Sequence, residues 1–145
     1  MAQEDKELLL KDLCARLPYG VHCCVLNLNK TIKEDNDIIY GIVGDNIVTL
    51  QSDKNECYMH YQVKPYLRPM SSMTEEENIE RKKLGILLAF GDNHKTIFSG
   101  FGAISGEDII KCFDWLNAHH FDFRNLISKG LAIEAPDGMY NLNEK

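Results

Sequence analysis

The stretch from Ser105 to Tyr140 constrains the fold more than any other, because it contains the only tryptophan and clear signals for where helices begin and end. Ser105 is a favourable N-cap, since its hydroxyl can accept a hydrogen bond from an unpaired backbone N–H of the first helical turn. Glu107 and Asp108 follow at the positive end of the helix dipole. Apolar residues then recur at helical spacing and predict an amphipathic helix. These residues are Ile109, Ile110, Cys112, Phe113, Trp115 and Leu116.

A second, shorter helix is predicted after the first, followed by an extended segment. Asp122 is placed to cap this second helix and Gly130 to stop it, as glycine commonly does at a helix C-terminus. The Pro-Asp-Gly turn signal at 136–138 predicts a tight end to a short extended segment that contains Leu131 and Ile133. Two facing helices would bury one apolar cluster, which we expect to be the centre of the core. Its members are Phe113, Trp115, Leu116, Phe123 and Leu126.

The first half of the chain predicts an N-terminal helix followed by a β-rich segment. Residues 4–16 have amphipathic helical spacing, with Cys14 on the apolar side beside the leucines and Asp12 on the polar side. Pro18 ends this helix, because the residue before a proline is disfavoured in the α conformation. Beyond it, short apolar runs alternate with turn signals. We expect four strands at 21–26, 38–43, 47–50 and 57–63, with a polar loop at 27–36.

These strands predict an antiparallel sheet, because parallel neighbours need crossover connections of about a dozen residues or more. The clearest hairpin joins 38–43 to 47–50 across a Gly-Asp-Asn turn. The sheet is small enough to curl into a half-barrel of the SH3-like type. The predicted fold class is therefore α+β, with an N-terminal helix, a small antiparallel sheet, a middle helix and a C-terminal helical pair.

The middle helix is predicted from two candidate capping boxes, Ser72–Glu75 and Thr74–Glu77. Both place its start near residue 74, and it should run to about residue 83. The region 86–99 is ambiguous between an extension of this helix and a strand hairpin, and we favour the hairpin.

We expect a single domain over residues 1–145, because the chain is too short for two comfortable domains. Pro65 and Pro69 should hold a connector extended and keep it out of any central strand. The parts in order are the helix 4–16, the β-rich segment 20–63, the proline connector 64–73, a helical or mixed segment 74–104 and the helical pair 105–140.

Composition excludes several classes of protein. The chain is 44% hydrophobic and 26% charged, which is typical of globular proteins rather than disordered ones. Its net charge of −6 argues against binding to a nucleic-acid backbone, which requires a basic surface, and acidic residues at 75–77 largely balance the one basic run at 81–83. No secretion signal or membrane span is expected, and the five cysteines form no CxxC pair. We therefore expect a cytoplasmic protein with reduced thiols.

No residue pattern predicts a catalytic centre, a metal site or a cofactor, so an enzyme is not the favoured class. His119 and His120 are adjacent, and on a helix their side chains point about 100° apart, so they are poorly placed to share a metal ion. Cys14 and Cys112 are expected in the core. A cysteine nucleophile would need one of the cysteines at 23, 24 or 57 to meet His22 or His60 across the sheet. The glycines at 100, 102 and 106 match no phosphate-binding motif and are read as a linker.

The candidate binding residues are aromatic and basic, the types that are favoured at interface hot spots. They are Tyr66, Arg68, Trp115, His119 and Arg124. Each also has a structural interpretation: the tryptophan as a core residue, and the arginines as partners in salt bridges.

Three blocks of the sequence carry a resemblance to a known group of proteins. The blocks are KELLLKDLCARLPYGV, VKPYLRPMSSMTEEE and DWLNAHHFDFRNLISKGLAIEAPDGMY, and they cover a little under half of the chain. They resemble a recurrent group of small proteins encoded in gut-bacterial genomes and their phages or prophages. The resemblance implies a mobile-element setting, a cytoplasmic location and an accessory role. It implies no catalytic residue, because the group has no established activity.

Three hypotheses follow for the function. The favoured one is a non-enzymatic phage or prophage protein that binds a host macromolecule, in particular a host protein or part of the host's defence machinery. The second is a small-ligand protein that binds or sequesters a nucleotide signal, and the third is an enzyme of unrecognised type. A homodimer formed through an exposed apolar helix surface is compatible with each of them.

Overall fold

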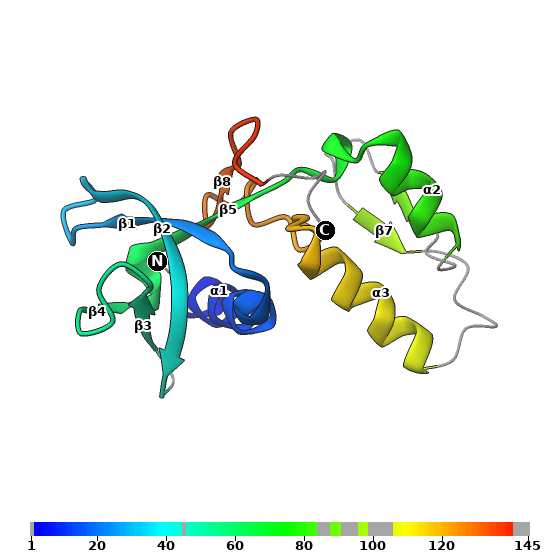
Figure 1. Cartoon of the computed structure of the whole chain (residues 1–145). Helices are drawn as coiled ribbons and strands as arrows, with labels where there is room; N and C mark the ends of the chain where they lie inside the picture. Colours follow the sequence, from blue (N-terminus) through cyan, green and yellow to red (C-terminus); the bar gives the residue numbers. More distant parts are fainter. Residues whose placement is uncertain (1, 45, 84–87, 91–95, 99–105, 141–145) are drawn as a thin grey trace.

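The computed structural model describes residues 2–44, 46–83, 88–90, 96–98 and 106–140, and it confirms the predicted α+β class (Figure 1). Helix α1 lies against a six-stranded sheet, while α2 and α3 lie beyond one side of that sheet together with a two-stranded pair. The elements in chain order are α1 (Gln3–Arg16), β1 (His22–Leu26), β2 (Ile32–Val43), β3 (Ile47–Leu50), β4 (Cys57–Met59), β5 (Val63–Leu67), α2 (Glu75–Lys83), β6 (Leu88–Phe90), β7 (Thr96–Phe98), α3 (Gly106–Ala118) and β8 (Ile133–Glu134).

The strands of the large sheet have the order β4-β3-β2-β1-β5-β8. The predicted antiparallel pairing is confirmed for β1 to β5, while β8 joins the edge parallel to β5. The predicted hairpin is also confirmed, since β2 and β3 pair from Ile39 opposite Leu50 to Val43 opposite Ile47.

Strand β2 is longer than predicted and changes its partner along its length. Residues 32–38 pair with β1 and residues 39–43 pair with β3, with register shifts in both ladders. The predicted loop at 27–36 is therefore wrong from Ile32 onward: the polar side chains there are mostly exposed, but they sit on a strand whose backbone is paired. Register shifts of this kind bend a strand. The bend is compatible with an SH3-like curl, which stays a prediction.

The single strand predicted at 57–63 is two strands separated by a 3₁₀ turn at His60–Gln62. Contacts with distant residues hold this turn. The His60 N–H donates to the carbonyl of Asn46 at 2.7 Å, and the Gln62 amide donates to the carbonyl of Leu26 at 3.1 Å. The turn thus separates two strands that have different partners. Strand β4 pairs with β3, whereas β5 pairs with β1.

Pro65 lies in β5, which has β1 on one side and β8 on the other, so the prediction that it stays out of a central strand is wrong. It is opposite Cys23 of β1, and the pairing with β8 begins one residue later, at Tyr66. A proline cannot donate a ladder hydrogen bond, so it is tolerated where the second pairing has not yet begun. Pro69 follows the strand and precedes a 3₁₀ turn at Met70–Ser72.

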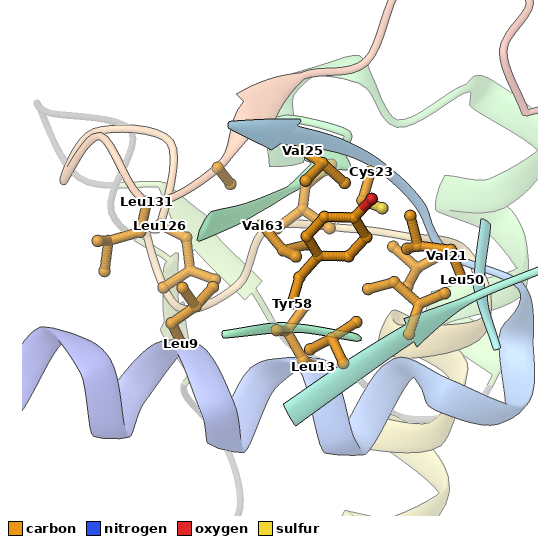
Figure 2. Close-up of a cluster of buried hydrophobic side chains, with 14 residues drawn as sticks. Leu9, Leu13, Val21, Cys23, Val25, Leu50, Tyr58, Val63, Leu126 and Leu131 are labelled. Atoms are coloured by element: carbon orange, nitrogen blue, oxygen red, sulfur yellow. The ribbon is translucent and has the colours of Figure 1, made fainter. Parts of the chain in front are cut away.

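Helix α1 confirms the prediction for residues 4–16 and covers the sheet with its leucines (Figure 2). Leu9 and Leu13 are fully buried. Two of the predicted side-chain positions are wrong, because Asp12 is completely buried and Cys14 is exposed. Asp12 is buried because cationic partners from α1 and from the C-terminal half surround it, as described below. The cluster under α1, here called the sheet core, comprises Leu9, Leu13, Val21, Cys23, Val25, Ile39, Val48, Leu50, Tyr58, Val63, Leu67, Leu126, Leu131 and Ala132.

Helix α3 is confirmed, and its inner side contributes to a second cluster, here called the helical core. Ile110 is 62% exposed and does not belong to it, contrary to the prediction. Ser105, the predicted N-cap, lies outside the described residues, as do the linker glycines at 100 and 102. The members of the helical core are Met70, Cys112, Trp115, Leu116, Phe121 and Phe123, with Met73 and Phe113 at its margin.

Residues 122–130 form successive turns, so the predicted second helix of the C-terminal pair is wrong. Asn125 has a φ of 60°, a left-handed conformation that interrupts a helix. Asp122 still caps the segment, since its carboxylate accepts the N–H groups of Leu126 at 2.8 Å and Ile127 at 3.0 Å. The turns carry Leu126 into the sheet core rather than beside Trp115. The prediction of one central cluster is therefore wrong, because the core consists of two clusters.

Local signals elsewhere are confirmed. Of the two candidate capping boxes, Thr74–Glu77 forms: the Glu77 N–H donates to Thr74 Oγ1 at 3.2 Å and the Thr74 N–H donates to Glu77 Oε1 at 2.9 Å. Strands β6 and β7 pair antiparallel, as expected for the favoured hairpin. The predicted extended segment is β8, and the turn at 136–138 is closed by a bond from the Met139 N–H to the Pro136 carbonyl.

Candidate functional site

Glu77 is the centre of a buried network of charges that joins three parts of the chain. Arg68 donates to both carboxylate oxygens at 2.7 Å, and Nδ1 of His119 lies 3.1 Å from Oε2. The Thr74 N–H is the third partner and supplies the fourth hydrogen bond, to Oε1 at 2.9 Å. The side chains of Glu77 and Arg68 are only 8% and 7% exposed. This Glu77 network therefore ties the end of β5 to the start of α2 and to the residues that follow α3.

The Glu77 carboxylate is chemically saturated. Burial alone would raise its pKa, but the hydrogen bonds from Arg68, His119 and Thr74 outweigh burial and hold the pKa well below its usual range. An ionised carboxylate has about four acceptor positions, and these four bonds occupy them. Glu77 is therefore suited to hold structure together rather than to exchange a proton with a substrate.

Trp115 belongs to the same region but not to an open surface. Its indole N–H donates to Glu80 at 3.0 Å, and its ring lies 4.3 Å, between centroids, from that of His119. Phe121 also stacks on Trp115, with a centroid distance of 5.8 Å. Trp115 is 8% exposed. Its structural interpretation, core packing, is the one that the contacts support.

Asp12 is the centre of a second buried ionic group. Arg16 Nε donates to Oδ2 at 2.7 Å, and Arg124 Nη1 donates to Oδ1 at 2.9 Å. Arg16 is fully buried and also donates to the carbonyl of Phe121 at 2.6 Å. These contacts join α1 to the chain that follows α3. They explain why Asp12, which the sequence placed on the polar side of α1, is buried.

Tyr66 and His120 take part in further contacts, which join two strands to each other and the strands to the C-terminal segment. The Tyr66 hydroxyl donates to the Asp35 carbonyl at 2.7 Å, and burial raises its pKa to about 12. His120 stacks on Tyr140 with centroids 3.7 Å apart, and the Tyr140 hydroxyl donates to the Tyr66 carbonyl at 2.7 Å. Burial first, and the charge of Arg16 next, lower the pKa of His120 to about 3. His120 is therefore neutral at physiological pH.

The five predicted binding residues thus occupy three separate places. Arg68, Trp115 and His119 come together around Glu77, Arg124 contacts Asp12, and Tyr66 contacts Asp35. Their contacts are with the protein itself, and among them the His119 side chain, at 27%, and that of Arg124, at 22%, are the more exposed. A direct role for any of them in binding a partner stays a prediction.

The cysteines and histidines of the described residues do not assemble a reactive centre. Burial first, and Asp37 beside it, raise the pKa of the Cys23 thiol to about 12, which is the opposite of nucleophile activation. Cys112 is buried, as predicted, and Cys14 and Cys57 are exposed. Within the described ranges, no three His, Cys, Asp or Glu side chains gather closely enough to hold a metal ion.

A shallow pocket of about 280 Å³, lined mostly by polar residues, lies where β2 changes partner, and local sequence reasoning missed it. Its lining comes from β1, the middle of β2 and the residues after β3, which only the folded sheet brings together. Hydrogen bonds pair Ser52 with Asp37 and His22 with Asn36, so serine and histidine are not joined as in a nucleophile–base pair. The lining residues are His22, Asn36, Asp37, Ile38, Gln51 and Ser52.

Exposed apolar side chains are concentrated along β2 and the turn before it. Among the residues whose exposure is described, six large apolar side chains are strongly exposed, and four of them fall between residues 28 and 43. These four, here called the β2 surface, are Leu28, Ile32, Tyr40 and Val43, at 78%, 61%, 54% and 58% exposure. The other two, Ile79 and Ile110, lie on α2 and α3.

Comparisons with protein-family models, with curated proteins and with solved structures found no match to this chain. None of the helices in the described residues has the length and apolar character needed to cross a membrane.

Proposed function

We propose that this protein is a non-enzymatic accessory protein of phage or prophage type that binds a host protein through the β2 surface. The observation that carries the proposal is that three of the six strongly exposed large apolar side chains described lie on β2 and a fourth, Leu28, lies in the turn before it. Isolated exposed apolar residues are common on soluble proteins, whereas patches of them mark interaction sites.

The chemistry of the polar groups supports binding rather than catalysis. Glu77 has its acceptor positions filled, Cys23 has a raised pKa, and His120 is buried and neutral. These are the groups that a catalytic centre would need in a reactive state. The mobile-element setting comes from the sequence resemblance alone.

The β2 surface also indicates what kind of protein would bind there. Ile32 is followed by Lys33, Glu34 and the exposed Asp35, and the Lys54 ammonium lies 4.2 Å from the centroid of the Tyr40 ring. An apolar centre with neighbours of both charges is complementary to a partner whose apolar patch has a rim of mixed charge. A Tyr side chain such as that of Tyr40 is a frequent hot-spot residue.

Affinity capture from a bacterial host lysate tests the proposal with matched variants. We expect the wild-type protein to enrich a specific host protein, and the double variant Ile32→Ser/Val43→Ser to lose at least about tenfold of that enrichment. The control is Ile79→Ser/Ile110→Ser, which removes the same amount of exposed apolar surface from the two helices and should leave capture unchanged.

The captured protein must also bind the purified wild-type protein, with the same ranking of the two variants. Circular dichroism and thermal melting show whether each variant is folded. Absence of any specific host protein, or equal loss of capture in both variants, would contradict the proposal.

A further inference from the structure

We propose that the shallow pocket on β2 binds an alkyl guanidinium or ammonium group, with Asp37 as its counter-ion. The site adjoins the apolar β2 surface but uses other residues and another chemistry, so the inference goes beyond the proposed function. It rests on the hydrogen-bond inventory of the lining residues and on the charges around them.

Asp37 has an acceptor position to spare. Asp37 is only 8% exposed, yet it lines the pocket. Oδ1 accepts the N–H groups of Ile38 at 2.8 Å and of Ser52 at 3.3 Å, and Oδ2 accepts the Ser52 hydroxyl. A carboxylate has about four acceptor positions, so among the described contacts one position on Oδ2 is still open. A buried charge with an open position favours a charged donor as its partner.

Two neighbouring lining groups, the His22 imidazole and the Ser52 hydroxyl, offer further acceptors. Nδ1 of His22 lies 2.9 Å from Oδ1 of Asn36. With Nδ1 as the donor to this amide oxygen, Nε2 of the neutral imidazole is an acceptor. The Ser52 hydroxyl gives its proton to Asp37 and keeps its own lone pairs. The side-chain amides of Asn36 and Gln51 add N–H donors to the lining, so it is the Asp37 carboxylate that favours a ligand with several N–H groups.

The charges around the pocket select against anions. Its six lining residues include one carboxylate and no lysine or arginine. Glu34 and Asp35 precede the lining residues on β2, and Asp37 is the largest charged contributor to the raised pKa of the adjacent Cys23. Phosphate recognition normally uses basic side chains or clustered backbone N–H groups. The pocket is therefore unsuited to the nucleotide signal considered from the sequence, and suited to a cation.

The cation could be a free small molecule or a side chain of a bound protein, since both present the same group. The pocket residues 36–38 lie on β2 between Ile32 and Tyr40 of the β2 surface. A partner bound at the β2 surface could thus place an arginine or lysine side chain in the pocket. The pocket itself is tested without any partner, so its failure and the failure of the proposed function are separate results.

The test is an NMR titration of the isotope-labelled full chain with three probes. Agmatine represents a free alkyl guanidinium, N-acetyl-arginine amide represents the side chain within a peptide, and AMP is the anionic comparison. We expect both cations to shift the backbone amide signals of Ile38, Gln51 and Ser52, with half-saturation at about 1 mM, the range for a single ion pair with few other contacts. AMP should leave these signals in place.

Variants separate the pocket from general attraction to an acidic protein. Gln51→Lys places an ammonium group at the exposed side of the pocket and should weaken agmatine binding by about tenfold or more. Asn55→Lys adds the same charge at an exposed residue outside the lining and should change binding by about twofold or less. Asp37→Asn should also weaken binding if that variant folds.

Three results would overturn the inference. The first is an absence of shifts with both cations up to about 20 mM, well above the expected half-saturation. The second is a response to AMP equal to that with agmatine. The third is an equal loss of binding in Gln51→Lys and Asn55→Lys, which would show that only the net charge of the protein matters.

Discussion

The sheet region, α1 with the six-stranded sheet, and the helical region, residues 70–83 and 106–123, are stabilised in different ways. The sheet core consists of apolar side chains, most of them fully buried, and contains no charged member (Figure 2). The helical core has buried ions beside it: Arg68 and Glu77 are both less than a tenth exposed. The sheet region has one buried ion pair of its own, Arg16 with Asp12 on α1, and Arg124 from the C-terminal half joins it.

The difference teaches where each region is vulnerable. Apolar burial is non-directional, so the sheet core should lose stability in proportion to the volume that is removed. A buried ion pair depends on both partners, and removal of one leaves an uncompensated charge inside the protein. The predictions below test this contrast, beginning with the largest expected effect.

The variant Arg68→Met should destabilise the protein by about 3–5 kcal/mol, because it leaves the Glu77 carboxylate buried without its guanidinium partner. The double variant Arg68→Met/Glu77→Leu should recover most of that loss, since both charges are then absent. Urea unfolding followed by circular dichroism measures both free energies. If Arg68→Met alone lowers the free energy of unfolding by less than about 1 kcal/mol, solvent reaches Glu77, and the contrast between an apolar core and a buried ion pair is contradicted.

In the sheet core, Leu13→Ala should cost about 2–5 kcal/mol through lost burial and a residual cavity. The matched control is Leu28→Ala, a change of the same size at a side chain that is 78% exposed; it should cost about 0.5 kcal/mol or less. Equal effects of the two substitutions in urea unfolding would contradict the placement of Leu13 in the sheet core.

Acidification should weaken the protein through His120. Its pKa is about 3 in the folded protein and near its ordinary value of 6.5 when unfolded. Between these values the unfolded chain binds a proton that the folded protein excludes, so stability falls as pH drops below about 6.5, by at most about 1.4 kcal/mol per pH unit for this one group.

The variant His120→Asn isolates this contribution, because asparagine tolerates the positive φ of 64° at this position and does not titrate. Unfolding free energies measured at about pH 7.5 and about pH 5 should differ less in the variant than in the wild type. An identical change in both proteins would assign the pH dependence to other groups.

The smallest expected effect concerns the start of α2. Thr74→Ala removes the hydroxyl that accepts the Glu77 N–H and should cost about 1 kcal/mol. Ser72→Ala removes the hydroxyl of the alternative capping box, which does not form, and should cost less. If Ser72→Ala is the more destabilising substitution in thermal melts, the assignment of the cap is wrong.

Local chemistry was sufficient for much of the fold. The helix at 4–16, the hairpin of β2 and β3, the capping box at Thr74–Glu77 and the helix α3 follow from spacing and from turn residues close in sequence. Reasoning of the same kind failed at Pro65 and at residues 122–130. In both places the backbone conformation depends on pairing and packing with distant segments.

The candidate site was less predictable than the fold. Arg68, Trp115 and His119 were selected for their residue types, and the structure does bring them together, but around Glu77, which was not selected. The signal that could have found Glu77 was its place in the capping box, since a capping glutamate is held at a fixed position near the preceding turn. For the pocket at Asp37, no local signal existed.

What the sequence determined by itself was the kind of most elements, because helix spacing, caps and turns are properties of neighbouring residues. Only the tertiary structure decided that Asp12 lies inside, that two cores exist instead of one, and that His22, Asp37 and Ser52 share a pocket. The physical reason is that burial of a charge and the lining of a pocket depend on residues that are far apart in the chain and meet only when the sheet has formed.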